Sequence, residues 1–308
     1  GEGADAHVPQ ALSLIAAAHP LGERLRGLVR VGERRWDVVL DREQRIYLPE
    51  ENPVRALERV IALSQAQDML ESFLVEAANN NPGLKSKFKV YMAALEKVPQ
   101  VGVLPDPQIT FGYFIQPVET RVGPQRARIS ASQMFPWFGT LGAKKDAATE
   151  MAKSKYEMFE EAKSRLFYEV KSNWYNLYFT QKAMDITLEN INILNTFRKL
   201  ALIKVESGLA STVDVLRVEM EIADMENQLA FLKDNYYSMQ VGFNNLLNVD
   251  ENRIVNIPDT LRDDEFNLTH EAALDSIRSG NHQVMQLEFR EASYQKQEIA
   301  ARKTGNPN

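Results

Sequence analysis

The side chains best suited to bind a metal ion are the four histidines, and their positions argue against a site. His7, His19, His270 and His282 are far apart and lack the close spacing of paired ligands. The chain has no cysteine, so it can form neither a disulfide nor a thiolate metal site. We therefore expect surface histidines, with no bound metal and no cofactor.

The carboxylate pair Glu160-Glu161 is the other arrangement that could do chemistry, as a general acid and base. Both residues fall in a long helix-compatible stretch, where such a pair is more simply a solvated face. No nucleophile with a neighbouring base and no phosphate-binding loop accompanies the pair. We predict that the chain is not an enzyme and has no catalytic residues. Its net charge of −6 is spread along the sequence, so we expect no nucleic-acid partner.

Because the sequence indicates no catalytic or metal site, we turn to its predicted architecture. The largest predicted feature is a pair of helices between residues 143 and 248. Neither proline nor glycine occurs from Ala143 to Glu206, which allows a helix of ~96 Å at ~1.5 Å per residue. Gly208 ends this first helix, and Ser211 or Thr212 can cap the second, with Asp214 in its first turn. The break at 207–211 therefore predicts a tight hairpin.

Apolar residues of both helices follow a heptad rhythm, which predicts an antiparallel coiled coil. In the second helix they are Val215, Val218, Ile222, Met225, Leu229, Leu232, Tyr236, Met239, Phe243 and Leu246. In the first they are Val170, Trp174, Leu177, Met184, Leu188 and Ile191, with Gln181 in the vacant place. A coiled coil with a purely structural role remains an open alternative on these residues alone.

Two alternating segments precede the hairpin and predict paired strands. Residues 108–116 place Ile109, Phe111, Tyr113 and Ile115 on one face, and residues 126–133 place Arg128, Ser130 and Ser132 on the polar face. Such strands suit a transmembrane barrel hairpin, and an ordinary soluble β-hairpin is the alternative. No apolar run reaches about 18 residues, so we expect no membrane-spanning helix.

An internal repeat with an offset of 200 residues links the two ends of this region. Leu74, Asn81 and Leu84 correspond to Leu274, Asn281 and Val284, and Asp106-Pro107 corresponds to Asn306-Pro307. We interpret 249–308 as an equatorial segment followed by the start of a second repeat.

Residues 1–70 have a different character. They contain nine arginines and no lysine, whereas the rest contains sixteen lysines and eleven arginines. A helix is predicted over 9–28, short strands over 28–40 and 45–48, and a helix from Pro53. The stretches 31–40, 46–50 and 53–60 resemble the β-domain of the cell-division protein FtsQ. We expect this partial domain to be marginally stable alone and to contribute little function.

The remainder, residues 71–308, resembles the TolC outer-membrane efflux family, with most likeness to its heavy-metal-efflux branch. The motifs are Asn80-Asn81-Pro82-Gly83-Leu84, Leu104-Pro105-Asp106-Pro107, the run 133–139 and the run 207–216. The resemblance implies a homotrimer whose strands form one barrel in outer-membrane lipid, above a periplasmic helical tunnel. It further implies a periplasmic adaptor (membrane fusion protein) and an inner-membrane pump as partners.

The same resemblance implies roles for three groups of residues. The hairpin tip would dock on the adaptor, the barrel would meet the helices at an aromatic junction, and polar strand residues would face the lumen. These groups are Ser207, Gly208, Leu209, Ala210 and Ser211 for the tip; Phe135, Pro136, Trp137 and Gly139 for the junction; and Arg128, Ser130 and Ser132 for the lumen. A capping contact for Leu209 and core packing for Trp137 are the alternatives.

The complete expectation is an α+β fold, mainly α. A small partial α/β fragment (1–70) precedes an efflux domain that comprises a helix (71–98), a barrel β-hairpin (108–133) and the coiled-coil hairpin (143–248). The function is a passive export conduit in the outer membrane of a Gram-negative bacterium, with an FtsQ-like division scaffold as the alternative. We interpret the chain as a chimera and a fragment at both ends, which carries two barrel strands where the family has four.

Overall fold

The computed structural model describes residues 8–32, 35–41, 44–261 and 269–304. Long helices dominate and two small sheets accompany them, which confirms the expected fold class. The chain divides into two compact units, residues 1–81 with 166–267 and residues 82–165 with 268–308. The domain boundary near residue 70 stays a prediction.

The first unit begins with a small α/β segment. Helix α1 (Val8–Ala17) and the 3-10 turn η2 (His19–Arg24) precede an antiparallel sheet of β1 (Leu25–Val31), β2 (Arg35–Leu40) and β3 (Arg45–Tyr47), in that order. The predicted helix over 9–28 is therefore wrong beyond Ala17. Pro20 lacks the amide hydrogen that a continuing helix needs, and Gly22 adopts a positive φ of 52°.

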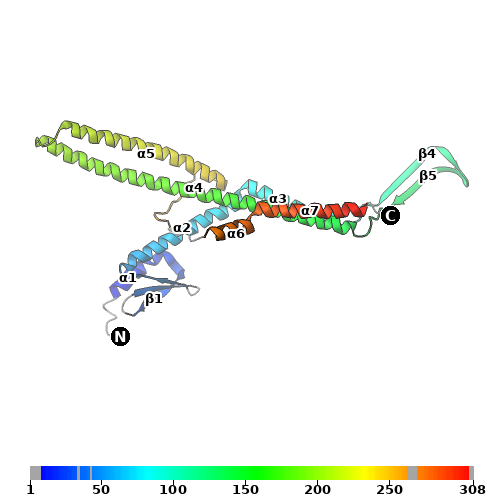
Figure 1. Ribbon diagram of the computed structural model, residues 1–308, viewed down its shortest axis with the longest axis horizontal. Coiled ribbons are helices and arrows are strands. Elements are labelled where there is room, and N and C mark those ends of the chain that lie inside the picture. Colours follow the sequence, from blue (N-terminus) through cyan, green and yellow to red (C-terminus); the bar gives the residue numbers. More distant parts are fainter. Residues whose placement is uncertain (1–7, 33–34, 42–43, 262–268, 305–308) are drawn as a thin grey trace. The chain divides into compact units, whose positions relative to one another are not determined.

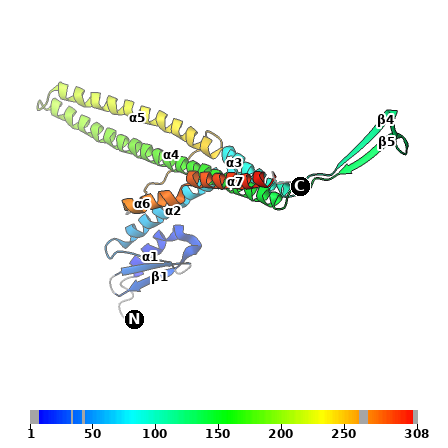
Figure 2. The same cartoon turned by 45° about the vertical axis from the view of Figure 1, so that its right-hand side comes forward.

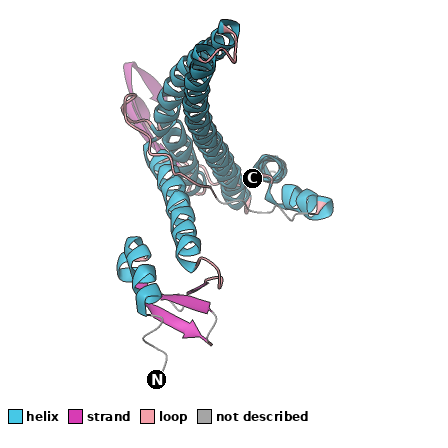
Figure 3. Cartoon of the chain, turned by 90° about the vertical axis from the view of Figure 1, so that its left-hand side faces the viewer, coloured by secondary structure: helices cyan, strands magenta, loops and turns pink. Residues whose placement is uncertain are grey.

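A contiguous apolar core holds this segment together. Leu14 and Ala18 of the helical part pack with Val38 and Leu40 of β2, and with Leu57 of the next helix. Figure 3 shows the helix and the strands of this segment together. Trp36 lies at the edge of this core and donates a hydrogen bond from Nε1 to Gln10 Oε1 at 3.0 Å.

Helix α2 (Pro53–Asn80) runs without a break across residue 70. The sequence predicted a helix from Pro53 and a second helix over 71–98, whereas the structure has one helix from Pro53 to Asn80 and a break at Asn81, so the predicted 71–98 helix is divided there. The first turns of α2 complete the small core, and its last turns pack against the helical hairpin through Phe73 and Phe243, whose ring centroids are 5.2 Å apart. One helix therefore serves two packing environments.

The hairpin consists of α4 (Thr140–Glu206) and α5 (Thr212–Leu247), which run side by side in opposite directions (Figures 1 and 2). Most of the predicted seam is buried, and Met184, Ile191 and Leu229 form a cluster with Met225, Leu232 and Tyr236 around it. Leu188 is an exception at 44% exposed, so its assignment to the seam is wrong. The neighbouring Thr187 is buried instead, because the straight helix drifts against a strict 3.5-residue repeat.

The second unit contains α3 (Pro82–Val101), β4 (Gln108–Thr120), β5 (Gly123–Ser132), α6 (His270–Gly280) and α7 (His282–Thr304), together with the start of α4. Buried polar contacts attach α7 to α4. Ser293 Oγ donates to the Ala147 carbonyl at 2.8 Å, and Ser154 Oγ donates to the Gln286 carbonyl at 2.9 Å.

The expected 200-residue repeat reappears in the helix boundaries. Helix α2 ends at Asn80 and α3 begins at Pro82, while α6 ends at Gly280 and α7 begins at His282. Asn81 and Asn281 occupy the two breaks. The last predicted pair, Asn306-Pro307, lies outside the described residues.

Within the described ranges, no helix combines the length and the apolar character needed to cross a membrane. Nor does that part of the chain gather three or more His, Cys, Asp or Glu side chains in a cluster that could hold a metal ion.

Candidate functional site

The hairpin tip is a tightly bonded turn. Leu209 N donates to the Lys204 carbonyl at 2.8 Å, and Gly208 N donates to the Val205 carbonyl at 3.0 Å. This pair of bonds is the Schellman arrangement, which satisfies carbonyls at a helix C-terminus and requires a left-handed residue. Gly208 supplies that residue with a φ of +73°. Ser207 Oγ adds a bond to the Lys204 carbonyl at 3.0 Å.

The far side of the turn is fixed by a capping box at the start of α5. Val213 N donates to Ser211 Oγ at 3.3 Å, and Ser211 N donates to Asp214 Oδ2 at 3.2 Å. Of the two caps that the sequence allowed, Ser211 is the one used. The turn thus holds its backbone by hydrogen bonds at both ends.

Leu209 is 79% exposed at this turn, with Ala210 partly buried beside it. A capping contact would bury most of the leucine side chain, so the exposure favours a projecting apolar residue over that alternative. The tip therefore offers one leucine on a rigid turn.

The β4–β5 hairpin pairs as the alternation predicts. Ile109 lies opposite Ala131, Phe111 opposite Ile129, and Tyr113 opposite Ala127, so one face is apolar. Thr110 lies opposite Ser130, Gly112 opposite Arg128, and Gln108 opposite Ser132, which makes the second face polar.

The apolar face of this hairpin is open, and Ile115 is 92% exposed. A large exposed apolar face marks a surface that meets lipid or another chain. Among the described residues no core covers this face.

The predicted junction follows β5 directly. Phe135 and Trp137 are exposed, with Trp137 at 40%, so core packing does not explain this tryptophan. Pro136 is partly buried, and Gly139 adopts a φ of +77° before α4 begins. The Gly139 carbonyl accepts a bond from Lys303 Nζ at 3.4 Å. The segment changes direction at two residues suited to do so.

The base of the helical hairpin carries a polar network that the sequence did not single out. Asn244 is fully buried, and its Nδ2 donates to the carbonyls of Glu251 at 3.0 Å and Arg253 at 2.8 Å. Arg253 Nη1 in turn donates to Glu76 Oε1 of α2 at 2.6 Å. Asn244 directly follows the buried Phe243 of the seam, but its partners belong to the segment after α5, which the sequence did not place. This network fixes the chain after α5 to the end of α2.

A second missed feature is an exposed apolar stripe along α4, here called the outer stripe. At about 100° per residue, it lies on the opposite side of the helix from the buried seam residues Val170, Leu177 and Met184. Its members are Tyr168, Phe179, Ile186, Ile193, Phe197 and Leu200, all exposed. Helix α5 repeats the arrangement with the exposed Val213, Met220 and Phe231 opposite its own seam. Both helices therefore have two apolar sides.

Two tyrosines on these helices have shifted acidities. Burial raises the pKa of Tyr236, which packs against the seam cluster. A hydrogen bond with Glu160 and the charge of that carboxylate raise the pKa of Tyr156. His282 Nδ1 lies 2.7 Å from Glu157 Oε2, so this histidine is paired within the second unit rather than free on the surface. His7 lies outside the described residues.

Comparison with known proteins separates the chain into two parts. The family model for the C-terminal part of the cell division protein FtsQ/DivIB matches residues 1–79. The FtsQ protein of Roseobacter litoralis is 70% identical over 70 residues, which cover 23% of this chain and 24% of the relative. The chain thus spans about a quarter of the length of this curated relative. A segment similar to part of FtsQ precedes the rest, which supports the chimera interpretation.

The remaining part matches channels in fold. The outer membrane protein VceC from Vibrio cholerae superposes with a TM-score of 0.60 at 14% identity, covering 78% of this chain and 60% of that one. The transmembrane channel CusC gives a TM-score of 0.61 at 13% identity, covering 76% and 56%. The family model described as outer membrane efflux protein matches residues 73–249, more than half of the chain. With its long helical hairpin and its strand pair, this chain belongs to the outer membrane efflux protein family.

Proposed function

We propose that residues 71–308 form one wall element of a passive export conduit in the outer membrane of a Gram-negative bacterium. The conduit is a homotrimer that works with a periplasmic adaptor and an inner-membrane pump. The observation that carries this proposal is the outer stripe of α4. A helix in an isolated two-helix hairpin needs one apolar side, whereas a helix in the wall of a tube needs one for each neighbour.

The strand pair β4–β5 supports the same function. Its apolar face, with Ile109, Phe111 and Tyr113, is suited to contact outer-membrane lipid, and its polar face is suited to line water. Arg128, Ser130 and Ser132 are then the lumen-facing residues. Phe135 and Trp137 are placed at the end of the strands, where aromatic side chains suit the membrane interface.

The hairpin tip is the proposed contact for the adaptor. Its five residues, 207–211, form a turn held by hydrogen bonds at both ends, and Leu209 projects from it. A rigid turn with one exposed leucine loses little conformational entropy when a partner covers it. Specificity for the export cargo is left to the polar lining of the conduit, since a channel selects by lumen size and charge.

Site-specific photo-cross-linking tests the adaptor contact. A benzophenone attached at Leu209→Cys should label a co-expressed periplasmic adaptor, because the chain has no other cysteine. The same probe at Leu202→Cys, an exposed position of α4 outside the turn, is the matched control. Labelling of the adaptor from Leu202 but not from Leu209 would contradict the assignment of the tip.

The second candidate function is a division scaffold carried by the first 79 residues. Its support is the 70% identity to FtsQ and the contiguous core that joins α1, β2 and α2. Membrane fractionation separates the two functions. Recovery with outer-membrane markers supports the conduit, whereas retention with inner-membrane division proteins supports the scaffold.

A further inference from the structure

Where β5 leads into α4, the surface of the second unit has an open apolar hollow of about 750 Å³, here called the junction hollow. Its lining includes Leu104, Phe135, Trp137, Phe138 and Leu141. Phe135 is 66% exposed and Phe138 is 90% exposed, so the aromatic side chains are free to contact an occupant. The volume lies within the range of ligand sites.

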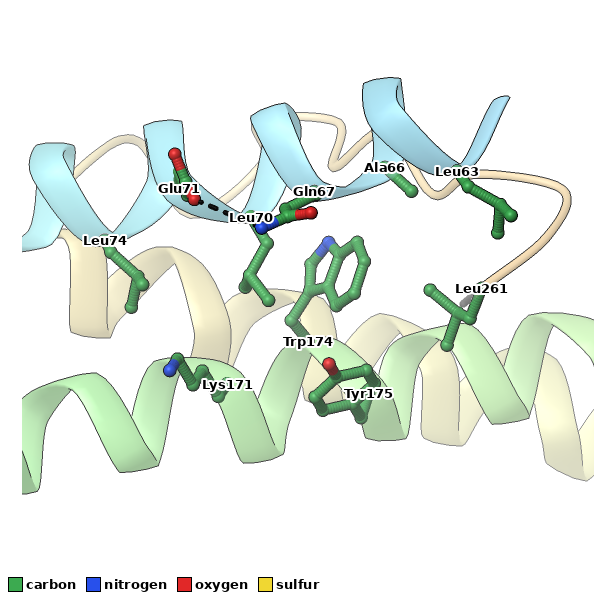
Figure 4. Close-up of a pocket in the computed structure, with 10 residues that line it drawn as sticks. All are labelled: Leu63, Ala66, Gln67, Leu70, Glu71, Leu74, Lys171, Trp174, Tyr175 and Leu261. Atoms are coloured by element: carbon green, nitrogen blue, oxygen red, sulfur yellow. Dashed lines mark hydrogen bonds between the residues drawn. The ribbon is translucent and has the colours of Figure 1, made fainter. Parts of the chain in front are cut away.

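The hollow between α2 and α4 of the first unit is different, because it is a packing groove. Figure 4 shows Ala66 of α2 facing Trp174 of α4 across it. These two residues are only 3% and 1% exposed, so the two helices already cover each other there. The exposure of Phe138 shows that the junction hollow has no comparable cover among the described residues.

Lysine side chains of two helices lie beside the junction hollow. Lys303 Nζ of α7 donates to the carbonyl of Gly139, a lining residue, at 3.4 Å. An ammonium has three N–H donors, so this bond leaves capacity for a further partner. Lys145 lies one turn after Leu141 on the same face of α4. Its Cδ is 3.3 Å from the position that a Cβ on Gly102 would take, which places it beside the chain that leads to Leu104.

This end of the second unit carries four lysines, here called the junction lysines: Lys97, Lys144, Lys145 and Lys303. Among the described residues no ion pair joins any of them to a carboxylate, and Glu298 is paired with Arg302 instead. Asp106 and Asp146 are exposed in the adjoining segments and offset part of the charge. The first turn of α4 has no acidic residue, so its dipole adds to the positive potential. The surface therefore favours an anion.

An open aromatic hollow with cationic side chains at its edge suits an anionic lipid. An acyl chain needs apolar space, and a headgroup phosphate is attracted to ammonium groups on flexible stems. The hollow also lies at the base of the strand pair, because Gln108 of β4 pairs with Ser132 of β5. The apolar face of that pair is open as well. Lipid can cover both surfaces, whereas an acidic peptide in the hollow would leave the strand face uncovered.

From these observations we propose that the junction hollow binds an anionic phospholipid. An acyl chain packs against Phe135 and Phe138, and the headgroup phosphate pairs with Lys145 and Lys303. No covalent step is involved. This inference rests on the proposed location in the outer membrane and adds to it a preference among lipids.

Native mass spectrometry of the full chain measures which lipid stays bound. The chain is purified in detergent that contains equal amounts of palmitoyl-oleoyl phosphatidylglycerol and palmitoyl-oleoyl phosphatidylcholine. These lipids share their acyl chains and differ in net charge. The bound ratio should favour phosphatidylglycerol by about 5- to 25-fold, the factor expected for one or two lysines near a lipid phosphate.

Substitutions separate the charge from the apolar contact. Lys145→Gln and Lys303→Gln should each lower the ratio by about 3- to 5-fold, and the double variant should bring it near 1. Lys199→Gln changes an exposed lysine of α4 outside the second unit and should leave the ratio unchanged. Phe138→Ala should weaken the binding of both lipids and keep the ratio, because it removes apolar contact only. Circular dichroism checks the fold of each variant.

Equal binding of the two lipids by the parent chain would overturn the inference and leave the proposed export function standing. An unchanged ratio in the folded double variant would do the same. Binding of neither lipid would also overturn the inference, and membrane fractionation of the parent chain then shows whether the export function fails with it.

Discussion

Gly208 is the residue on which the hairpin tip depends most directly. Its φ of +73° lies in the left-handed region, where a side chain is strained even though no atom lies within 4 Å of its Cβ position. Gly208→Ala should therefore lower the free energy of unfolding of the hairpin by about 1 kcal/mol. Urea denaturation monitored by circular dichroism measures the change.

Gly242 provides the matched control for that substitution. It lies within α5, also has open space at its Cβ position, and does not have a positive φ. Gly242→Ala should raise the free energy of unfolding by about 0.5–1 kcal/mol, because alanine favours a helix over glycine. If the two substitutions change stability in the same direction, the account of the turn is wrong.

Because of Tyr236, the stability of the seam should decrease at alkaline pH. Because burial raises its pKa in the folded state, the unfolded state ionises first as the pH rises above about 10. The stability that Tyr236 contributes should be complete below the unfolded pKa and should be lost as the pH passes through the higher folded pKa. Thermal melts at pH 9 and pH 11 should show a smaller loss of Tm for Tyr236→Phe than for the parent chain.

Tyr237→Phe serves as the control and should lose as much Tm as the parent chain between pH 9 and pH 11. The hydroxyl of this neighbouring tyrosine is exposed on α5 and donates a hydrogen bond to Asn252. An alkaline loss of Tm that is equally large in the parent chain and in Tyr236→Phe would show that the buried tyrosine does not carry the effect.

Among the elements, the long helices and the strand pair could be read from the sequence because each obeys a local rule. The absence of proline and glycine from Ala143 to Glu206 predicted the body of α4, and the Ser211–Asp214 spacing predicted the start of α5. The period-two alternation predicted the regular paired part of β4 and β5, although β4 extends to Thr120 and β5 begins at Gly123. These features depend on residues that are close together in the chain.

The elements that could not be predicted depend on partners distant in the chain. The outer stripe was hidden because apolar residues on both sides of α4 blur the heptad pattern. The continuity of α2 was hidden because its two halves pack in different environments. The role of Asn244 required knowing that the chain after α5 returns to meet it.

The two sides of α5 should respond differently to truncation. Leu229 is buried in the seam cluster, so Leu229→Ala should lower the free energy of unfolding by about 2–4 kcal/mol. Phe231 is exposed on the opposite side, and Phe231→Ala should change the stability of the isolated protomer by less than about 0.5 kcal/mol. Chemical denaturation of the protomer measures both, and a larger cost at Phe231 would contradict the assignment of the sides.

At the scale of the whole molecule, the chain joins two families through one continuous helix. The residues that match the cell-division family end within α2, and those that match the efflux family begin within it. Because the first turns of α2 belong to the small core and the last turns to the base of the hairpin, each part retains its packing partners across the join. Such a join is compatible with folding of both parts.

The central claim is that the outer stripe of α4 meets further copies of this chain. Its direct test is bismaleimide cross-linking of Ile186→Cys in outer-membrane preparations, with the buried seam variant Ile222→Cys as the control. Each copy then carries one cysteine, so a cross-linker that reaches between neighbours captures two copies, and native mass spectrometry gives the full assembly. We predict cross-linked pairs for Ile186→Cys alone and a mass of three chains. A monomeric mass, with Ile186→Cys uncross-linked and freely accessible to a bulky maleimide, would contradict the account.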